Sequence, residues 1–260
     1  MPPSQTTERP KPPTQPAAQL SVVVPVRNEQ GNIIPLIDEI GRALGAVAFE
    51  IVYVNDASTD ATGSILAECA KKYPSLRIVT HKAAFGQSAA IASGIKAARA
   101  TVIATIDGDG QNDPADIPRL LAVYNQADDN AMLLVAGLRA ARKDSLVKRM
   151  SSRIANRVRR RLLHDDTPDT GCGLKVFSRS TFMEMPHFDH MHRFLPALAL
   201  RQGGRVVSVP VNHRSRQSGV TKYGLFDRLW VGIIDLFGVV WLMKRALDPE
   251  SDAKPPGEAS

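Results

Sequence analysis

Short apolar runs alternate with amphipathic stretches along the first hundred residues. Four runs rich in Val, Ile or Leu predict buried strands: residues 20–26, 49–54, 76–80 and 101–106. Three helices are predicted between these strands. The first begins at Asn28 and Glu29 and has apolar residues at 33, 37, 40 and 44. The second contains the apolar residues 65, 66 and 69, and the third is an Ala-rich helix over 87–99. Strands that alternate with helices of about a dozen residues indicate βαβ units. The pattern therefore predicts an α/β domain with a mostly parallel central sheet and helices on both faces.

The alternation continues in the second half of the chain. Helices are expected over residues 116–124, 143–162 and 194–200, and strands over 132–136, 171–177 and 206–209. The strand at 171–177 is entered through a tight turn that contains Gly171 and Gly173. Residues 213–223 predict a polar, basic loop, for which an ordinary surface loop is the simplest interpretation.

The two ends of the chain differ from this pattern. Residues 1–19 contain six prolines and almost no large apolar side chains, which predicts a disordered tail without a signal peptide. Residues 229–243 are almost all apolar, with Asp235 among them, and as a helix they would reach about 22 Å, short of the ~30 Å hydrocarbon core. We therefore expect a membrane-associating helix over 225–247, with a complete span or an ordinary buried helix as alternatives. Residues 248–260 predict a second disordered tail.

Composition is ordinary for a soluble domain, but the positive charge is local. Of 260 residues, 43% are hydrophobic and 23% charged, which fits a globular protein with a sizeable core. The two cysteines, Cys69 and Cys172, lie far apart, which suggests a reducing compartment and no disulfide framework. Residues 139–161 hold ten Lys or Arg and one acid, although the whole chain has a net charge of only +7. Such a segment predicts a local anionic partner.

The helix predicted over 143–162 places its basic side chains on one face. Residues 149, 153, 157 and 160 are Arg at helical spacing, beside an apolar stripe at 146, 150, 154 and 158. A basic and apolar helix suits an anionic membrane surface, and a solvated helix edge packed on the sheet is the alternative. Nucleic acid is disfavoured, because no aromatic platform or groove-reading motif accompanies the arginines.

Three polar loops follow predicted strands at their carboxyl ends. They are Pro25–Glu29, Asn55–Asp60 and Asp107–Asn112. Ligands of such sheets bind past the carboxyl ends of the strands, so we expect these loops to form one site. In the third loop, Asp107 and Asp109 stand one residue apart among glycines, with Gln111 beside them. Hard cations such as Mg²⁺ or Mn²⁺ bind carboxylates together with phosphate oxygens, which predicts a metal site in this loop. The simpler interpretation is a turn rich in Asp and Gly that binds no ligand.

Seven runs, in this order, resemble glycosyltransferases of family 2, and within it the branch of dolichol-phosphate mannose synthase and bacterial undecaprenyl-phosphate sugar transferases. The runs are VPVRNE (24–29), NDASTDAT (55–62), FGQSAA (85–90), DGDGQNDP (107–114), GLR (137–139), DTGCGLKVF (169–177) and RSRQSGVTKYG (214–224). The resemblance covers about residues 20–245. It implies a GT-A type fold for nucleotide-diphospho-sugar transferases over 20–224 and an inverting transfer that depends on Mg²⁺ or Mn²⁺.

The resemblance also implies a role for each matching residue. The nucleotide sugar, linked to UDP or GDP, would contact Pro25, Val26, Glu29, Asp56, Gly86, Gln87, Asp107 and Gly108, with Asp56 facing the base. The metal would bind Asp107, Asp109 and Gln111, and the phosphate of a polyprenyl lipid would contact Arg139, Arg149, Ser152, Arg214, Arg216 and Lys222. The sequence departs from the family pattern at Arg27, Asn55 and the pair at 83–84, which bears on base and sugar recognition more than on the reaction class.

The nucleophile separates two versions of the chemistry. A phosphomonoester has a second pKa near 6, so it is largely anionic at pH 7 and needs only positioning, which Arg provides in forked geometry. A sugar hydroxyl needs a general base, and Asp169 is the one acid placed for that role, although it could equally cap a turn. The abundance of arginines favours the phosphate, with Asp107, Asp109, Arg139, Arg149 and Asp169 as the catalytic candidates.

Three hypotheses follow. The first is an enzyme at the cytoplasmic face of a membrane, peripheral or anchored by one segment, that attaches a sugar to a polyprenyl phosphate for a cell-envelope glycan. The second is a soluble glycosyltransferase that acts on a saccharide hydroxyl with Asp169 as the base. The third is a membrane-docking or nucleotide-sensing module without turnover. The sequence leaves the sugar, the nucleotide and the oligomeric state open.

Overall fold

A computed structural model describes residues 18–127, 132–139, 159–215 and 225–245, and the side chains of 225–231 are not included. Its first strand shows why the apolar runs form a sheet. In β1 (Leu20–Val26), Val22 and Val24 pack into one hydrophobic cluster and Val23 packs into another. Because successive side chains of a strand point to opposite faces, a strand with consecutive buried apolar residues is covered on both sides. Burying each of these side chains stabilises the fold by ~1.5–3 kcal/mol.

In the part of the chain that the structure describes, seven strands form one sheet in the order β3-β2-β1-β4-β6-β5-β7. The other strands are β2 (Phe49–Asn55), β3 (Leu76–Thr80), β4 (Val102–Thr105), β5 (Leu133–Arg139), β6 (Lys175–Ser178) and β7 (Arg205–Val211). Only β6 pairs antiparallel with its neighbours β4 and β5, and the remaining pairs are parallel. The carboxyl ends of six strands and the beginning of β6 therefore share one edge of the sheet.

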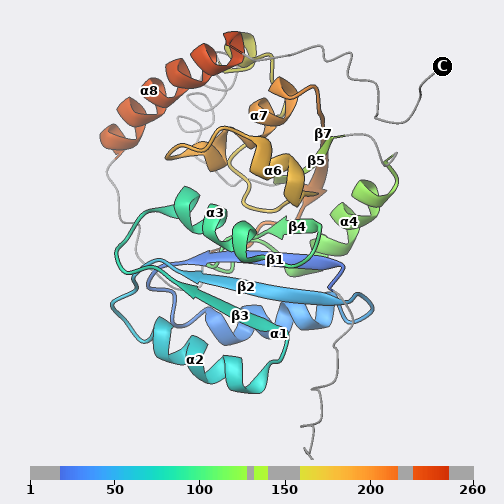
Figure 1. The fold of residues 1–260 in the computed structure, drawn as a ribbon, viewed down its shortest axis with the longest axis vertical. Coiled ribbons are helices and arrows are strands. Elements are labelled where there is room, and N and C mark those ends of the chain that lie inside the picture. Colours follow the sequence, from blue (N-terminus) through green and yellow to red (C-terminus); the bar gives the residue numbers. More distant parts are fainter. Residues whose placement is uncertain (1–17, 128–131, 140–158, 216–224, 246–260) are drawn as a thin grey trace, which may run out of the picture.

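Helices cover both faces, as the sequence predicts. One face carries α1 (Ile33–Ala43), α2 (Thr62–Lys72) and α4 (Ile117–Asn125), preceded by the short η1 (Pro114–Asp116). The other carries α3 (Gln87–Ala97), α6 (Arg179–Glu184), η2 (Met191–Arg193), α7 (Leu195–Arg201) and α8 (Leu225–Lys244). Figure 1 shows α1 and α2 on one side of β1–β3 and α3 on the other. The α/β class, the mostly parallel sheet and its two helical faces are confirmed.

Some element boundaries differ from the prediction for local reasons. The first helix begins at Ile33 rather than near Asn28, because Asn28 has a φ of 57° and its side chain accepts a hydrogen bond from the backbone of Thr59 (2.7 Å). Strand β5 continues to Arg139, three residues beyond the predicted end. This arginine therefore lies at the edge of the sheet where the carboxyl ends of the parallel strands meet. Most of the helix predicted over 143–162, residues 1–17 of the first predicted tail and all of the second lie outside the described residues.

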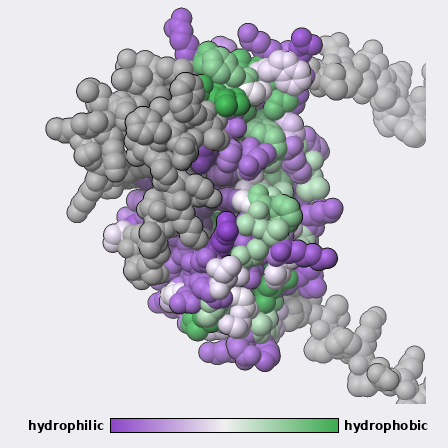
Figure 2. Space-filling view, turned by 90° about the vertical axis from the view of Figure 1, so that its left-hand side faces the viewer, coloured by the Kyte–Doolittle hydropathy of each residue, from purple (hydrophilic) through white to green (hydrophobic). Residues whose placement is uncertain are grey.

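The last helix, α8, packs on the domain along one side only. Val239 is buried, and Arg201 donates a hydrogen bond from Nε to the carbonyl oxygen of Leu242 (2.9 Å). On the opposite side, Ile234, Phe237 and Trp241 are 69%, 65% and 59% exposed. Figure 2 shows hydrophobic surface at the upper end of the molecule, at the height where Figure 1 places α8. Within the described part of the chain, no helix combines the length and apolar character that a membrane crossing requires.

Candidate active site

The acidic loop after β4 lies against the end of β1. Asp107 accepts a hydrogen bond at Oδ1 from Nε2 of Gln87 (2.8 Å), and Asp109 accepts one at Oδ1 from the backbone of Gln111 (3.1 Å). Between the two acids, a Cβ on Gly108 would overlap the side chain of Val26 and come within 2.9 Å of the carbonyl oxygen of Pro25. Only glycine therefore allows this loop to approach β1 so closely.

The electrostatics of the loop fit a divalent cation. Burial raises the pKa of Asp107 to about 6, and the charge of Asp109 adds to the rise, against the opposing effects of Lys175, Arg139 and Gln87. A cation held by both carboxylates would offset this repulsion. Within the described ranges, no group of three or more His, Cys, Asp and Glu is placed to hold a metal. A cation at Asp107 and Asp109, with Gln111 adjacent, would therefore take its remaining ligands from phosphate oxygens and water.

A single glycine supports this geometry from the opposite side. A Cβ at Gly173 would overlap the carboxylate of Asp107. We expect Gly173→Ala to displace that carboxylate and to weaken Mn²⁺-dependent nucleoside-diphosphate binding, tested with UDP and with GDP, roughly 10- to 100-fold, as changes around metal ligands do. Titration calorimetry with and without Mn²⁺ measures the effect. Gly41→Ala is the matched control, because a Cβ at Gly41 meets nothing within 4 Å. Unchanged metal-dependent binding in Gly173→Ala would contradict the assignment.

The loop after β2 lies next to the acidic loop, as predicted. Asp56 is buried and accepts hydrogen bonds from the backbone amides of Phe85 and Gly86 (2.9 Å each) and from Nδ1 of His81 (2.7 Å). Burial alone would raise the pKa of Asp56, but these hydrogen bonds hold it below its ordinary value. Because Gly86 precedes Gln87, which donates to Asp107, two successive residues connect the Asp56 carboxylate to the acidic loop. The contacts of Asp56 place the 85–87 segment, and its predicted contact with a base stays a prediction.

The loop after β1 completes this edge. Val26 accepts a hydrogen bond at its carbonyl oxygen from the backbone of Asp56 (2.9 Å). Glu29 accepts one at Oε2 from Nδ2 of Asn32 (2.7 Å), and its backbone donates to Oγ1 of Thr62 (3.0 Å). The three loops that follow β1, β2 and β4 therefore meet at one edge of the sheet, which confirms the geometric expectation.

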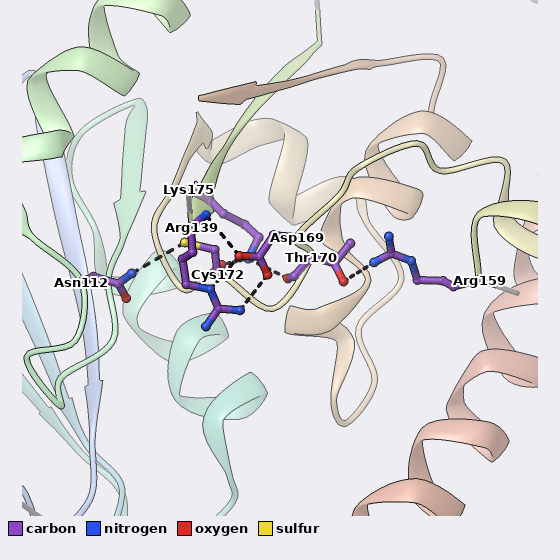
Figure 3. A network of polar contacts seen from close by, with 7 residues as sticks. All are labelled: Asn112, Arg139, Arg159, Asp169, Thr170, Cys172 and Lys175. Atoms are coloured by element: carbon purple, nitrogen blue, oxygen red, sulfur yellow. Dashed lines mark hydrogen bonds and ion pairs between the residues drawn. The ribbon is translucent and has the colours of Figure 1, made fainter. Parts of the chain in front are cut away.

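Arg139 and Asp169 form a forked pair beside this edge. Asp169 accepts hydrogen bonds at Oδ2 from Nε of Arg139 (2.6 Å) and at Oδ1 from Nη2 (2.7 Å), and the Arg139 side chain is 12% exposed. Figure 3 shows the pair next to Cys172 and Lys175, with Arg159 reaching Thr170 from the other side. Arg159 also donates to the carbonyl oxygen of Thr167. One arginine of the basic segment is thus a buried support for the loop that carries Asp169.

The remaining predicted phosphate contacts divide into two groups. Arg214 is described, and its guanidinium pairs with Glu39 (2.7 Å) and with Asp113 (2.7 Å), while its backbone donates to the carbonyl oxygen of Gln111 (2.9 Å). Arg214 therefore fixes the acidic loop in this structure. The others, Arg149, Ser152, Arg216 and Lys222, lie outside the described residues.

A cavity of about 350 Å³ opens beside Asp107, and sequence reasoning did not predict most of its lining. Lys175, His192 and Arg193 line it together with Gln87 and residues 170–173. One sequence feature could have indicated this cavity: Lys175 is a charged residue inside the otherwise apolar run 174–177. Nothing in the spacing of His192 and Arg193 pointed to the same place.

Comparisons with known proteins agree with this architecture. Residues 21–185 match the family model described as glycosyl transferase family 2. The chain is 36% identical over 241 residues to the dodecaprenyl-phosphate galacturonate synthase of Rhizobium johnstonii, covering 89% of this chain and 69% of the relative. It is 34% identical over 210 residues to the undecaprenyl-phosphate 4-deoxy-4-formamido-L-arabinose transferase of Edwardsiella ictaluri, covering 79% of this chain and 63% of that protein. The chain thus spans about two thirds of the length of these relatives.

Solved structures show the same fold at low sequence identity. Glucosyl-3-phosphoglycerate synthase from Mycobacterium tuberculosis in complex with UDP superposes with a TM-score of 0.66 at 19% identity, covering 89% of this chain and 82% of that one. A mannosyltransferase from Pyrobaculum calidifontis in complex with GDP-Man and Mn²⁺ gives 0.61 at 19% identity, with 95% and 69% covered. Other complexes of the mycobacterial enzyme contain Mn²⁺ or Mg²⁺. These likenesses support the GT-A type fold.

Proposed function

This chain belongs to glycosyl transferase family 2, and on that premise we propose that it transfers a sugar from a nucleoside-diphosphate sugar to the phosphate of a polyprenyl lipid, with inversion. The names of two relatives support the acceptor class, because both act on a polyprenyl phosphate. They name different sugars, a galacturonate and a formamido-arabinose, so they do not choose the donor.

The observation that carries this proposal is the forked pair of Arg139 and Asp169. Both carboxylate oxygens of Asp169 accept hydrogen bonds from the guanidinium, so the acid considered as a general base is already engaged. The same pair orients a guanidinium near the acidic loop, and Arg139 is a forked donor suited to phosphate. An anionic phosphate oxygen needs positioning rather than deprotonation, which this arrangement supplies.

Each residue of the candidate site has a separate role in the proposed reaction. Asp107 and Asp109 would hold Mg²⁺ or Mn²⁺, which when bound neutralises charge on the leaving diphosphate. Gln87 and Gly173 keep Asp107 in place, and Gly108 brings the loop against β1. Arg139, oriented by Asp169, holds the acceptor phosphate so that it attacks the sugar on the face opposite the leaving diphosphate.

Transfer to lipid phosphate tests the proposal directly. Labelled nucleotide sugars, a polyprenyl phosphate and Mn²⁺ or Mg²⁺ are incubated with the protein, and label in the organic phase is counted. We expect an organic-soluble product that disappears when EDTA removes the metal. Label transferred only to a saccharide, or nucleotide binding without any transfer, would instead favour the other two hypotheses.

We further propose that α8 lies on an anionic membrane surface. Its exposed face carries Ile234, Phe237 and Trp241, with Arg245 over the ring of Trp241 (6.0 Å to the centroid), an apolar surface bordered by charge. We expect the double replacement of Phe237 and Trp241 by Asp to weaken binding to phosphatidylglycerol vesicles at least about 100-fold, since each buried ring contributes ~1.5–3 kcal/mol.

Co-sedimentation with vesicles of increasing phosphatidylglycerol content measures this effect. Ile34→Asp is the matched control, because Ile34 is a 49% exposed apolar residue of α1 on the other face of the sheet. Equal binding of the double variant and the parent protein would refute the assignment of this face.

A further inference from the structure

The cavity beside Asp107 is lined by two cationic residues and one carboxylate. Its polar lining comes from α3, β4, the acidic loop after β4, the loop that precedes β6, β6 itself and η2: Gln87, Thr105, Asp107, Thr170, Lys175 and Arg193. Asp107 is the one carboxylate among its lining residues, and that acid is assigned to a cation. Lys175 and Arg193 are the cationic residues that line this space of about 350 Å³.

Lys175 is buried and only partly satisfied. It is 3% exposed at the start of β6, and its ammonium donates to the carbonyl oxygens of Thr170 (3.3 Å) and Cys172. An ammonium has three N–H bonds, so one is left without a hydrogen-bond acceptor among the described residues. Burial lowers the pKa of Lys175, because the ammonium loses its hydration. An anion that entered the cavity would offset this loss.

Arg193 contributes a second cation next to a neutral histidine. Within the described part of the chain, no carboxylate forms an ion pair with the guanidinium of Arg193. His192 bonds at Nδ1 to Oγ of Ser88 (2.7 Å), and burial lowers its pKa to about 3, so it adds no charge at neutral pH. The cavity thus combines a buried ammonium with a guanidinium, a pairing that suits a carboxylate.

We propose that this cavity receives the sugar of the donor and that Lys175 and Arg193 bind a carboxylate on it, so that the transferred sugar is a hexuronic acid. The inference rests on the proposed function, because it places the donor sugar beside the acids that hold the cation. Arg139, which is assigned to the acceptor phosphate, does not line this cavity. The carboxylate of the donor sugar and the acceptor phosphate therefore have separate cationic partners.

Binding of matched donor pairs tests this inference without requiring transfer. Dissociation constants are measured by calorimetry with Mn²⁺ for UDP-glucuronate against UDP-glucose, UDP-galacturonate against UDP-galactose, and GDP-mannuronate against GDP-mannose. We expect one uronate to bind about 10- to 100-fold more tightly than its neutral partner, the range for hydrogen bonds to charged groups. Lys175→Met and Arg193→Gln should each remove most of this preference, which is a ratio of two dissociation constants, so that a change in nucleoside-diphosphate affinity common to both donors cancels.

Arg205→Gln is the matched control, because Arg205 is exposed at the opposite end of β7 and should leave the preference intact. Melting temperatures identify any variant that fails to fold, and the two variants test the site independently.

Equal or tighter binding of the neutral sugars would overturn the inference. Transfer of a neutral sugar to lipid would then show that the proposed function still holds. A higher KM for polyprenyl phosphate in both variants, without a change in donor preference, would assign the cavity to the acceptor and also overturn it. A uronate preference without any transfer would uphold the inference and refute the proposed function.

Discussion

Replacing Asp109 by Asn is expected to lower kcat about 10²- to 10³-fold while leaving the fold intact, a loss of the size seen when one charge-stabilising group is removed from an active site. Asp109 and Asp107 are the two acids of the loop, and the amide would remove one of the two charges that attract the cation. The substitution is nearly isosteric, and the hydrogen bond from the backbone of Gln111 can still be accepted by the amide oxygen. The loss should therefore come from weaker neutralisation of the leaving diphosphate rather than from unfolding.

Sugar transfer measured over a range of Mn²⁺ concentrations tests this expectation. The variant should need much more Mn²⁺ and remain slow when saturated, with an unchanged melting temperature. Asp166→Asn, which removes one exposed carboxylate near the domain surface, is the control and should behave as the parent protein. Full activity of Asp109→Asn at the parent's Mn²⁺ requirement would exclude the acidic loop as the metal site.

The second large effect is expected at the forked pair, where the two partners should differ. Arg139→Gln should lower kcat/KM for the lipid phosphate about 10²- to 10³-fold, because it removes a charge-assisted, forked contact to the nucleophile. Asp169→Asn should cost only about tenfold, since its role is to orient Arg139. Both changes break a largely buried ion pair and are expected to lower stability, so assays are run well below the melting temperature of the weaker variant.

The pH dependence separates positioning from base catalysis at this pair. Protonation of a phosphomonoester below its second pKa near 6 removes the nucleophilic dianion, so activity should fall as pH drops through that value. Saturating Mn²⁺ keeps Asp107 ionised, although its pKa is about 6 in the metal-free chain. The fall in activity as pH drops through about 6 should persist in Asp169→Asn. If that variant instead loses this pH dependence and nearly all activity while Arg139→Gln remains active, Asp169 is the base and a hydroxyl is the acceptor.

The parts of the site that follow strand ends were predictable from the sequence. Parallel strands bring their carboxyl ends to one edge, so the positions of Pro25, Asp56 and Asp107 followed from the alternation of strands and helices. The roles of Arg214 and Arg159 did not follow, because their partners are tertiary. Arg214 reaches Glu39, 175 residues away, and Arg159 supports Thr170 from inside a segment that looked like a basic surface.

The partners of Lys175 escaped prediction for a similar reason. Its register opposite Thr105 and Ala136 depends on β6 running against its neighbours, which the hydrophobic pattern of a short strand does not reveal. A lysine in an apolar run could be recognised as unusual, but its place beside Asp107 could not.

The reversed direction of β6 has a consequence for how such a protein can change. Strands β1, β2 and β4 carry at their ends the loops that we propose bind the nucleotide, whereas β6 carries Lys175 at its beginning, after a loop supported by Arg159. The two sides of the candidate site are thus encoded by separate, contiguous stretches of the gene. Exchange of the later stretch could redirect such a transferase to another carbohydrate while its nucleotide preference is inherited unaltered.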